Sequence, residues 1–434
     1  MAVSFIAGCA RKESAIYFIR PSEPARFERL RSALRRKILQ VTSTDPFEIL
    51  KARVSKNLAG FTKDFPTDQD RFDIPSSRPD AKDFPVPELV LFMMRNVMGW
   101  EWSGHGEKVR WTVYGSFKGF PVFFEHRKFG FAIGMAGGDG KDRQRLINQL
   151  KTALKHVETY LAPIAKHQVS IGEASIANRF SEFDRRYRFF REKADKAYAT
   201  AKRRPRRRKT TDNVGTDEGL VTSFMSDITI GMNRMMQYSQ EAFYYSTAMV
   251  DAYFSLLEHR LVLLRAFTGK PLAPGELLEF LGTKWDDRLN LIVSDVNLSA
   301  DTLGKMRGIK ERIRNPFAHG GFENDGGSIF FHLPHIGAIP TNFSRFGNSV
   351  RFSFIPIEQE DHADVCAIFD SLDELLTTGV LERPHRLMDA GVDPSYDEDY
   401  IKKYHAAVSG TEEDLEEFLE RWGHEYMMHA NMDY

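Results

Sequence analysis

A run of basic residues near the middle of the chain divides it into two parts. Seven of the eight residues from Lys202 to Lys209 are Lys or Arg, with Pro205 among them. Like charges at this density repel one another and resist burial in a core, so the run indicates a boundary between folded domains. The residues after the run, 210–219, are polar and of types common in turns. We therefore expect a linker at 202–219 in this chain of 434 residues, which is long enough for two or three domains.

Residues 1–201, before the linker, carry the pattern of an antiparallel sheet followed by a helix. Apolar and aromatic residues alternate from Val109 to Phe117, and further aromatic segments follow with Gly and Pro between them. Leucines on one face then predict a helix over 142–161. The glycine-rich segment 134–140 lacks the spacing of a phosphate-binding loop, so we interpret it as a strand-to-helix turn. These patterns predict an α+β domain.

Residues 220–390, after the linker, show the apolar spacing of helices. Four amphipathic helices are predicted, over 249–264, 274–293, 303–313 and 361–378. Between the third and the fourth, two glycines open a β excursion in which residues 328–333 pair with 350–355. An acidic helix at 412–422 belongs to a C-terminal tail, residues 391–434. The prediction is an all-α bundle with a β-hairpin insertion.

Charge and cysteine content exclude several classes of protein. The 60 Lys and Arg residues balance 60 Asp and Glu residues, which excludes a uniformly basic coat for nucleic acid but not a local basic patch. Two cysteines, Cys9 and Cys366, are too few for a disulfide scaffold or a thiolate zinc site, and they fit a reducing compartment. No segment approaches the ~20 apolar residues of a membrane span. We expect a cytoplasmic protein that does not enter membranes.

The end of the third predicted helix carries the strongest chemical motif, Arg314-Asn315-Pro316, with His319 three residues further on. On an unbroken helix, Arg314 and His319 would diverge by about 140° and could not share a substrate. Proline disfavours a helical conformation in the residue before it, and Asn suits a helix N-cap, so we expect a break at Asn315. A new turn after the break would bring His319 back toward Arg314.

A basic face on the same helix surrounds this motif. Arg307, Lys310 and Arg314 are spaced i, i+3 and i+7, which places them on one side of the helix, opposite its apolar residues. A guanidinium that is always charged can hold and neutralise a phosphate, and an imidazole that titrates near neutrality can move a proton. Arg314 and His319 therefore suit phosphodiester cleavage by attack of a ribose 2′-hydroxyl, which needs no metal and no cofactor.

Four helices with Arg-Asn-x-x-x-His at the end of the third resemble the HEPN superfamily, and the tight spacing is similar to its Apea-like branch. Glu258-His259-Arg260 in the first helix and Trp285 in the second are further points of resemblance. The resemblance covers residues 235–385 and leaves the N-terminal half unexplained. The β excursion departs from the compact pattern of the family.

The resemblance implies a metal-independent endoribonuclease. Catalytic HEPN domains cut single-stranded RNA to leave a cyclic phosphate, and they dimerise so that two motifs face one composite site. One motif per chain thus implies a homodimer. By the same resemblance, Arg314 would anchor the phosphate, Asn315 would be the second polar residue and His319 would transfer the proton. Many family members are toxins or effectors in anti-phage and stress systems, so a regulatory protein or a phage-derived trigger is an expected partner.

Other residues carry weaker hypotheses. Glu258 is a weak candidate for contact with the site, and a solvated helix face is the alternative. The basic run offers an RNA tether or a solvated linker. Its arginines are Arg203, Arg204, Arg206, Arg207 and Arg208. His319, His332 and His335 lack the accompanying carboxylate or Cys pattern of a metal site, so no metal is expected. The alternative to an enzyme is a non-catalytic HEPN-fold module that binds RNA or protein.

Overall fold

The chain forms two compact units in a computed structural model. The structure describes residues 45–65, 73–202, 217–273, 275–293, 300–315, 329–343, 350–351 and 357–432. One unit comprises residues 1–174 together with 416–434, and the other comprises residues 175–415. We call them the N-terminal unit and the helical unit and describe each by itself.

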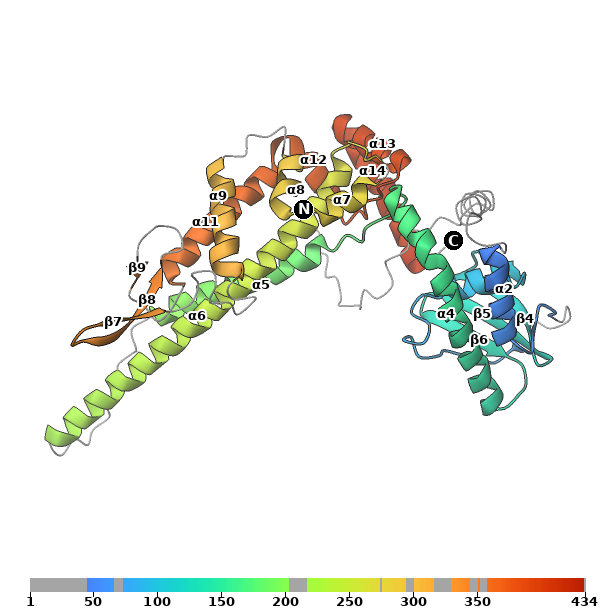
Figure 1. Cartoon of the computed structure of the whole chain (residues 1–434), viewed down its shortest axis with the longest axis horizontal. Helices are drawn as coiled ribbons and strands as arrows, with labels where there is room; N and C mark the ends of the chain where they lie inside the picture. The colour runs from blue at the N-terminus through green and yellow to red at the C-terminus, as the bar shows by residue number, and fades with distance from the viewer. Residues whose placement is uncertain are drawn as a thin grey trace, which may run out of the picture. The chain divides into compact units, whose positions relative to one another are not determined.

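The N-terminal unit is built on the predicted meander. Strands β4 (Val109–Phe117), β5 (Phe120–Arg127) and β6 (Gly130–Met135) pair antiparallel in sequence order (Figure 1). Short strands extend the sheet, namely β1 (Phe61–Thr62) and β3 (Glu101–Ser103) beside β4 and β2 (Ser76–Ser77) beside β6. Because hairpins join neighbours directly, the alternation of apolar residues was sufficient to predict the central strands.

Helices complete the core of this unit. They are α2 (Pro46–Asn57), α3 (Glu88–Leu91), a π-helical turn (Phe92–Val97) and α4 (Gly140–Ser170). The predicted apolar face of α4 is buried, with Leu146 and Leu150 at its centre. Asp139 and Asp142 form a capping box at its start, so the glycine-rich segment is the strand-to-helix turn that the sequence predicts. The C-terminal end of the chain also contacts this sheet, since Lys128 Nζ lies 2.9 Å from Asn431 Oδ1.

The helical unit is organised around one long helix, α6 (Asp217–Phe267), with α5 (Phe180–Ala201) packed along it (Figure 1). The sequence boundaries placed α5 in the first domain, but the structure groups it with the helices after the basic run. The reason is its apolar stripe, in which Tyr187 and Tyr198 are buried. The ring of Tyr187 lies 5.0 Å from that of Tyr253 on α6, so the stripe is covered by α6.

The remaining helices of this unit are α7 (Glu276–Gly282), α8 (Trp285–Ile292), α9 (Ala300–Ile309), a π-helical turn (Lys310–Arg314), α11 (Gln359–Thr377), a 3-10 turn (Gly379–Leu381), α12 (Glu382–Asp389) and α13 (Glu398–Ser409). Among them, α8, the π-helical turn and α12 contact α6. Helix α14 (Glu412–Asn431) begins in this unit, and its residues from 416 belong to the N-terminal unit. The predicted second helix is two helices, because Thr283 and Lys284 are extended between α7 and α8. Helix α13 packs on α6, so residues up to 415 belong to the helical unit and not to a separate tail from 391.

The predicted β excursion is present with a different pairing. Strand β7 (Ile329–Leu333) pairs antiparallel with β8 (Gly337–Phe343), and β9 (Val350–Arg351) pairs with β8. The sequence analysis predicted that residues 328–333 pair with 350–355. It did not predict the turn at His335, whose φ is +69°. Among the described residues, no helix combines the length and the apolar character that a membrane span requires.

Candidate functional site

The predicted basic face lies where α9 and its π-helical turn contact α6. Each of its three cations meets a carboxylate. Arg314 Nε lies 3.4 Å from Asp251 Oδ1, and Lys310 Nζ lies 3.3 Å from Glu258 Oε1. Asp251 and Glu258 are seven residues apart, so they share one face of α6. The third cation, Arg307, approaches Asp286 on α8 to 2.8 Å.

Arg314 is held by a weak pair. Its side chain is 26% exposed and that of Asp251 is 39% exposed. The second oxygen of Asp251 lies 3.5 Å from Arg186 Nη2 on α5, so one carboxylate lies between two guanidinium groups. Solvated pairs of this kind contribute about 0–1 kcal/mol. A phosphate could therefore replace Asp251 as the partner of Arg314 at small cost.

Lys310 is more tightly held than Arg314. Its ammonium lies 5.5 Å from the ring centroids of both Phe254 and Trp285, and its side chain is 19% exposed. Both aromatic faces favour a cation at this distance. Glu258, the weak candidate of the sequence analysis, is the ionic partner of Lys310. The structure therefore brings Glu258 to the basic face, as part of an ion pair.

A cavity of about 370 Å³ opens beside this face. Its lining comes from α6, the connection between α7 and α8, α8, α9, the π-helical turn and the residue after that turn: Glu258, Thr283, Lys284, Trp285, Asp286, Arg288, Arg307, Lys310, Glu311 and Asn315. Arg288 is occupied, because it donates to the carbonyl oxygens of Phe280 and Leu281. The volume lies within the range of small-ligand sites. The cavity thus places Asn315, Arg307 and Lys310 around one space.

Asn315 does not have the conformation that the sequence analysis expected. Its φ of −64° and ψ of −46° are helical, so the residue before Pro316 continues the helix. An N-cap residue requires non-helical angles, and Asn315 is therefore not an N-cap. The preference of pre-proline residues for extended backbone is overridden here by the end of the π-helical turn. Residues 316–328 lie outside the described part of the chain, and the predicted partner His319 is among them.

Two other predicted groups complete the comparison with the sequence. The five arginines of the basic run fall within 203–216, outside the described residues. His332 and His335 are described in the β7–β8 hairpin. Within the described ranges, no group of three potential metal ligands comes together.

No family model, curated protein or solved structure matches this chain.

The helical unit also contains a second polar cluster, which the sequence analysis did not predict. Ser246 Oγ lies 3.0 Å from His362 Nδ1, and His362 Nε2 lies 3.0 Å from Asp195 Oδ1. An ionised Asp195 can only accept, so Nε2 donates to it and Nδ1 accepts from the Ser246 hydroxyl. The order of groups is that of a serine-hydrolase triad. No local signal marks it, because the three residues come from α5, α6 and α11.

Burial argues against nucleophilic chemistry in this second cluster. Ser246 is 1% exposed and His362 is 3% exposed, whereas the Asp195 side chain is 59% exposed. A cavity of about 300 Å³ beside the cluster is lined by Asp195 and His362 but not by Ser246. Burial lowers the pKa of His362 despite the opposing effect of Asp195. The cluster therefore holds α5, α6 and α11 together through a neutral imidazole.

Proposed function

We propose that the helical unit is a metal-independent endoribonuclease of the HEPN type, with Arg314 and His319 as its reacting pair. The observation that carries the proposal is the position of Arg314. It ends the π-helical turn on the basic face, immediately before Asn315 of the cavity lining, and its ion pair with Asp251 is partly exposed. A guanidinium in this setting can exchange a carboxylate for the phosphate of RNA.

The proposed reaction is a transesterification within the RNA strand. His319 accepts the proton of a ribose 2′-hydroxyl, and the 2′-oxygen attacks the adjacent phosphorus. The bond from phosphorus to the 5′-oxygen breaks, which leaves a 2′,3′-cyclic phosphate, and the departing oxygen takes up a proton. Arg314 neutralises the charge that develops on the phosphate oxygens. Asn315, on the lining of the cavity, offers an amide for the neighbouring nucleotide.

The chain carries one such motif, so the proposed active form is a homodimer in which two motifs share the RNA. The N-terminal unit would sense a trigger or restrain the helical unit. A toxin or anti-phage effector is the biological setting that this arrangement suits. These roles rest on the resemblance of the motif to HEPN proteins.

The competing proposal is a non-catalytic module with the HEPN fold that binds RNA or protein. It is favoured by the pairing of all three cations of the basic face with carboxylates of the same unit. In such a module, Arg314 would serve the packing of α9 on α6 and would have no role in proton or phosphate chemistry.

Cleavage of single-stranded RNA in excess EDTA distinguishes the two. We expect the native chain to release fragments with 2′,3′-cyclic phosphate ends. The Arg314→Ala and His319→Ala variants should each be at least 100-fold slower, since electrostatic and acid–base groups contribute factors of that order. A matched control is Arg312→Ala, which removes an arginine of the same turn outside the motif. Equal cleavage by all variants, or intact RNA binding without cleavage by the native chain, would exclude the enzyme.

A further inference from the structure

The longest helix of the N-terminal unit presents a face of unusual composition. With 100° per residue, Lys141, Gln144, Arg145, Asn148, Thr152 and Lys155 fall within about 60° of one direction on α4. All six are exposed. We call them the α4 stripe. The only carboxylates between 141 and 159 are Asp142 and Glu158, which the same geometry places about 100° to either side.

The cations of the α4 stripe are available to a ligand. Within the described ranges, Lys141, Arg145 and Lys155 make no salt bridge. Two cations beside the stripe already have carboxylate partners: Lys118 pairs with Asp142 at 2.6 Å, and Lys151 pairs with Asp83. An unpaired cation needs no desolvation of an existing ion pair before it meets an anion.

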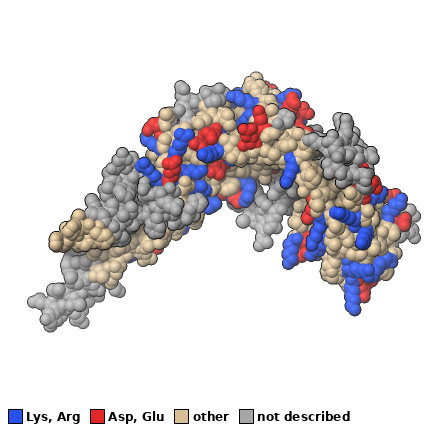
Figure 2. All heavy atoms as spheres, viewed as in Figure 1, with Lys and Arg blue, Asp and Glu red and all other residues tan. Residues whose placement is uncertain are grey.

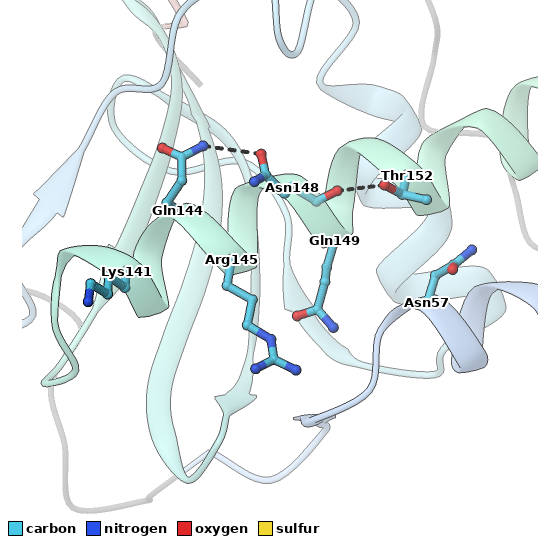
Figure 3. Close-up of a pocket in the computed structure, with 7 residues that line it drawn as sticks. All are labelled: Asn57, Lys141, Gln144, Arg145, Asn148, Gln149 and Thr152. Carbon is cyan, nitrogen blue, oxygen red and sulfur yellow. Dashed lines mark hydrogen bonds between the residues drawn. The ribbon is translucent and has the colours of Figure 1, made fainter.

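A groove lies along the α4 stripe. It has a volume of about 440 Å³, and Asn57 of α2 faces the stripe across it (Figure 3). In the same view, Arg145 and Gln149 extend from α4 on the side of Asn57. Gln149 Nε2 donates to the carbonyl oxygen of Ala59, which fixes this wall of the groove to the end of α2. Arg53 precedes Asn57 by one turn and is exposed.

The basic side chains of this part of the surface extend beyond the stripe itself. Figure 2 shows Lys and Arg side chains gathered over the region where Figure 1 draws α4 and α2. From Lys141 to Lys155 the helix rises about 21 Å, the length of roughly six phosphates along one strand of B-form DNA. Lys and Arg contact phosphates, and Asn, Gln and Thr supply the neutral hydrogen bonds that accompany them.

We propose that the α4 stripe and its groove bind the sugar–phosphate backbone of a nucleic acid. This binding goes beyond the proposed cleavage, because it belongs to the other unit and needs neither Arg314 nor His319. A membrane surface fits less well, since an interfacial helix needs exposed large apolar residues. None of the described residues of α2, or of α4 between 141 and 159, is an exposed large apolar residue. The same absence of anchors disfavours a protein partner.

The test is nucleic-acid binding by the full chain. A labelled 20-nucleotide 2′-O-methyl RNA is the probe, because it cannot be cut by 2′-hydroxyl attack. The variant is Lys141→Glu with Arg145→Glu. Its control is Lys402→Glu with Lys403→Glu, which changes the net charge equally on the exposed side of α13. We expect at least a 10-fold weaker Kd for the stripe variant alone. The slope of log Kd against log salt should fall by about 1.4, the value for two phosphate contacts with a single strand.

Further arms identify the ligand. DNA of the same sequence that binds as tightly as the RNA supports recognition of the backbone shared by the two. Equal Kd values for the native chain and the stripe variant would overturn the proposal. So would binding of anionic vesicles or polyglutamate in preference to both nucleic acids, which would assign the face to a membrane or an acidic protein. Because the probe is uncleavable, loss of this binding and loss of RNA cleavage are separate results.

Discussion

Arg314 and Arg186, on different helices, share one carboxylate. Their guanidinium groups lie 3.4 Å and 3.5 Å from the two oxygens of Asp251. Asp251 is therefore both the anchor of Arg314 and the competitor of any anion that Arg314 would bind. This dual position makes Asp251 a sensitive probe of the proposed site.

Neutralising this carboxylate tests the competition. If Arg314 binds phosphate, Asp251→Asn removes the competing anion and tightens binding of uncleavable RNA. We expect up to about 5-fold, which corresponds to the roughly 1 kcal/mol of a solvated pair. Asp301→Asn is the matched control, because among the described residues Asp301 pairs with Lys305 alone, on the exposed side of α9. Weaker RNA binding by Asp251→Asn, measured by fluorescence anisotropy, would show that Asp251 supports the site and does not compete with its ligand.

The buried ion pair between α6 and α11 is expected to dominate local stability. Arg260 is 3% exposed and lies 2.7 Å from Asp373, which also accepts from Tyr253 Oη. Asp373→Ala leaves a buried guanidinium without its partner, at a cost of about 3 kcal/mol or more. Asp301→Ala removes an exposed pair and should cost about 1 kcal/mol or less. Urea unfolding gives both values. Equal losses would mean that water reaches Arg260 when Asp373 is absent.

Two histidines predict acid sensitivity of the helical unit. Burial lowers the pKa of His259 and of His385 to about 4 in each case, and positively charged Arg179 and Arg260, respectively, add to the effect. The unfolded chain takes up protons near pH 6.5, whereas the folded unit does so only near pH 4. The contribution of the two neutral histidines to the free energy of unfolding is therefore complete above pH 6.5, and it is lost as the pH falls toward 4.

His259 offers a specific check of this pH dependence. Its Nε2 accepts a hydrogen bond from the backbone N–H of Arg179 at 3.0 Å, which only the neutral imidazole can do. Glutamine can accept the same bond but does not titrate. We expect His259→Gln to unfold in urea with a smaller loss of stability between pH 7 and pH 4.5 than the native chain. An unchanged loss would assign the acid sensitivity to other groups.

Replacing two glycines of the N-terminal unit by alanine should have opposite effects on its stability. A Cβ at Gly134 on β6 would overlap the ring of Phe123 on β5, which is fully buried. Gly134→Ala should therefore destabilise the unit by about 1–3 kcal/mol. Gly140 begins α4, and a Cβ there would meet nothing within 4 Å. Gly140→Ala should be neutral or stabilising by up to about 1 kcal/mol. Thermal unfolding of both variants measures the difference, and a stable Gly134→Ala variant would contradict the packing of β5 on β6.

Local patterns predicted the fold where the packing is local. The meander from Val109 to Met135 and the buried face of α4 follow from spacing of two and 3.6 residues, because hairpins and helix faces join residues near in sequence. The packing of α5 on α6 did not follow from such local patterns. Its apolar stripe shows that it needs a partner but not which one, and α6 supplies that partner across the basic run.

The arrangement of the basic face followed from the sequence in part for the same reason, and its function stays a prediction. Arg307 in α9 and Lys310 and Arg314 in the π-helical turn lie along one continuous helical segment. Each of them pairs with a carboxylate. Their carboxylate partners come from α6 and α8, at sequence separations that carry no periodic signal. Asn315 shows the limit of a local rule, since the helix continues through the residue before Pro316. That Arg314 and His319 approach each other remains a prediction.

The π-helical turn at Lys310–Arg314 sets the rotational phase of Arg314 and Asn315 relative to α9. A π-helical turn accommodates an extra residue within a helix, and each residue of a regular helix accounts for about 100° of rotation. The same residues in a regular α-helix would have the same composition and charge. The extra residue would then no longer be absorbed, and the Arg314 guanidinium would be turned away from Asp251 by about a quarter of a revolution. The chemistry of this face thus depends on the number of residues per turn as much as on their identity.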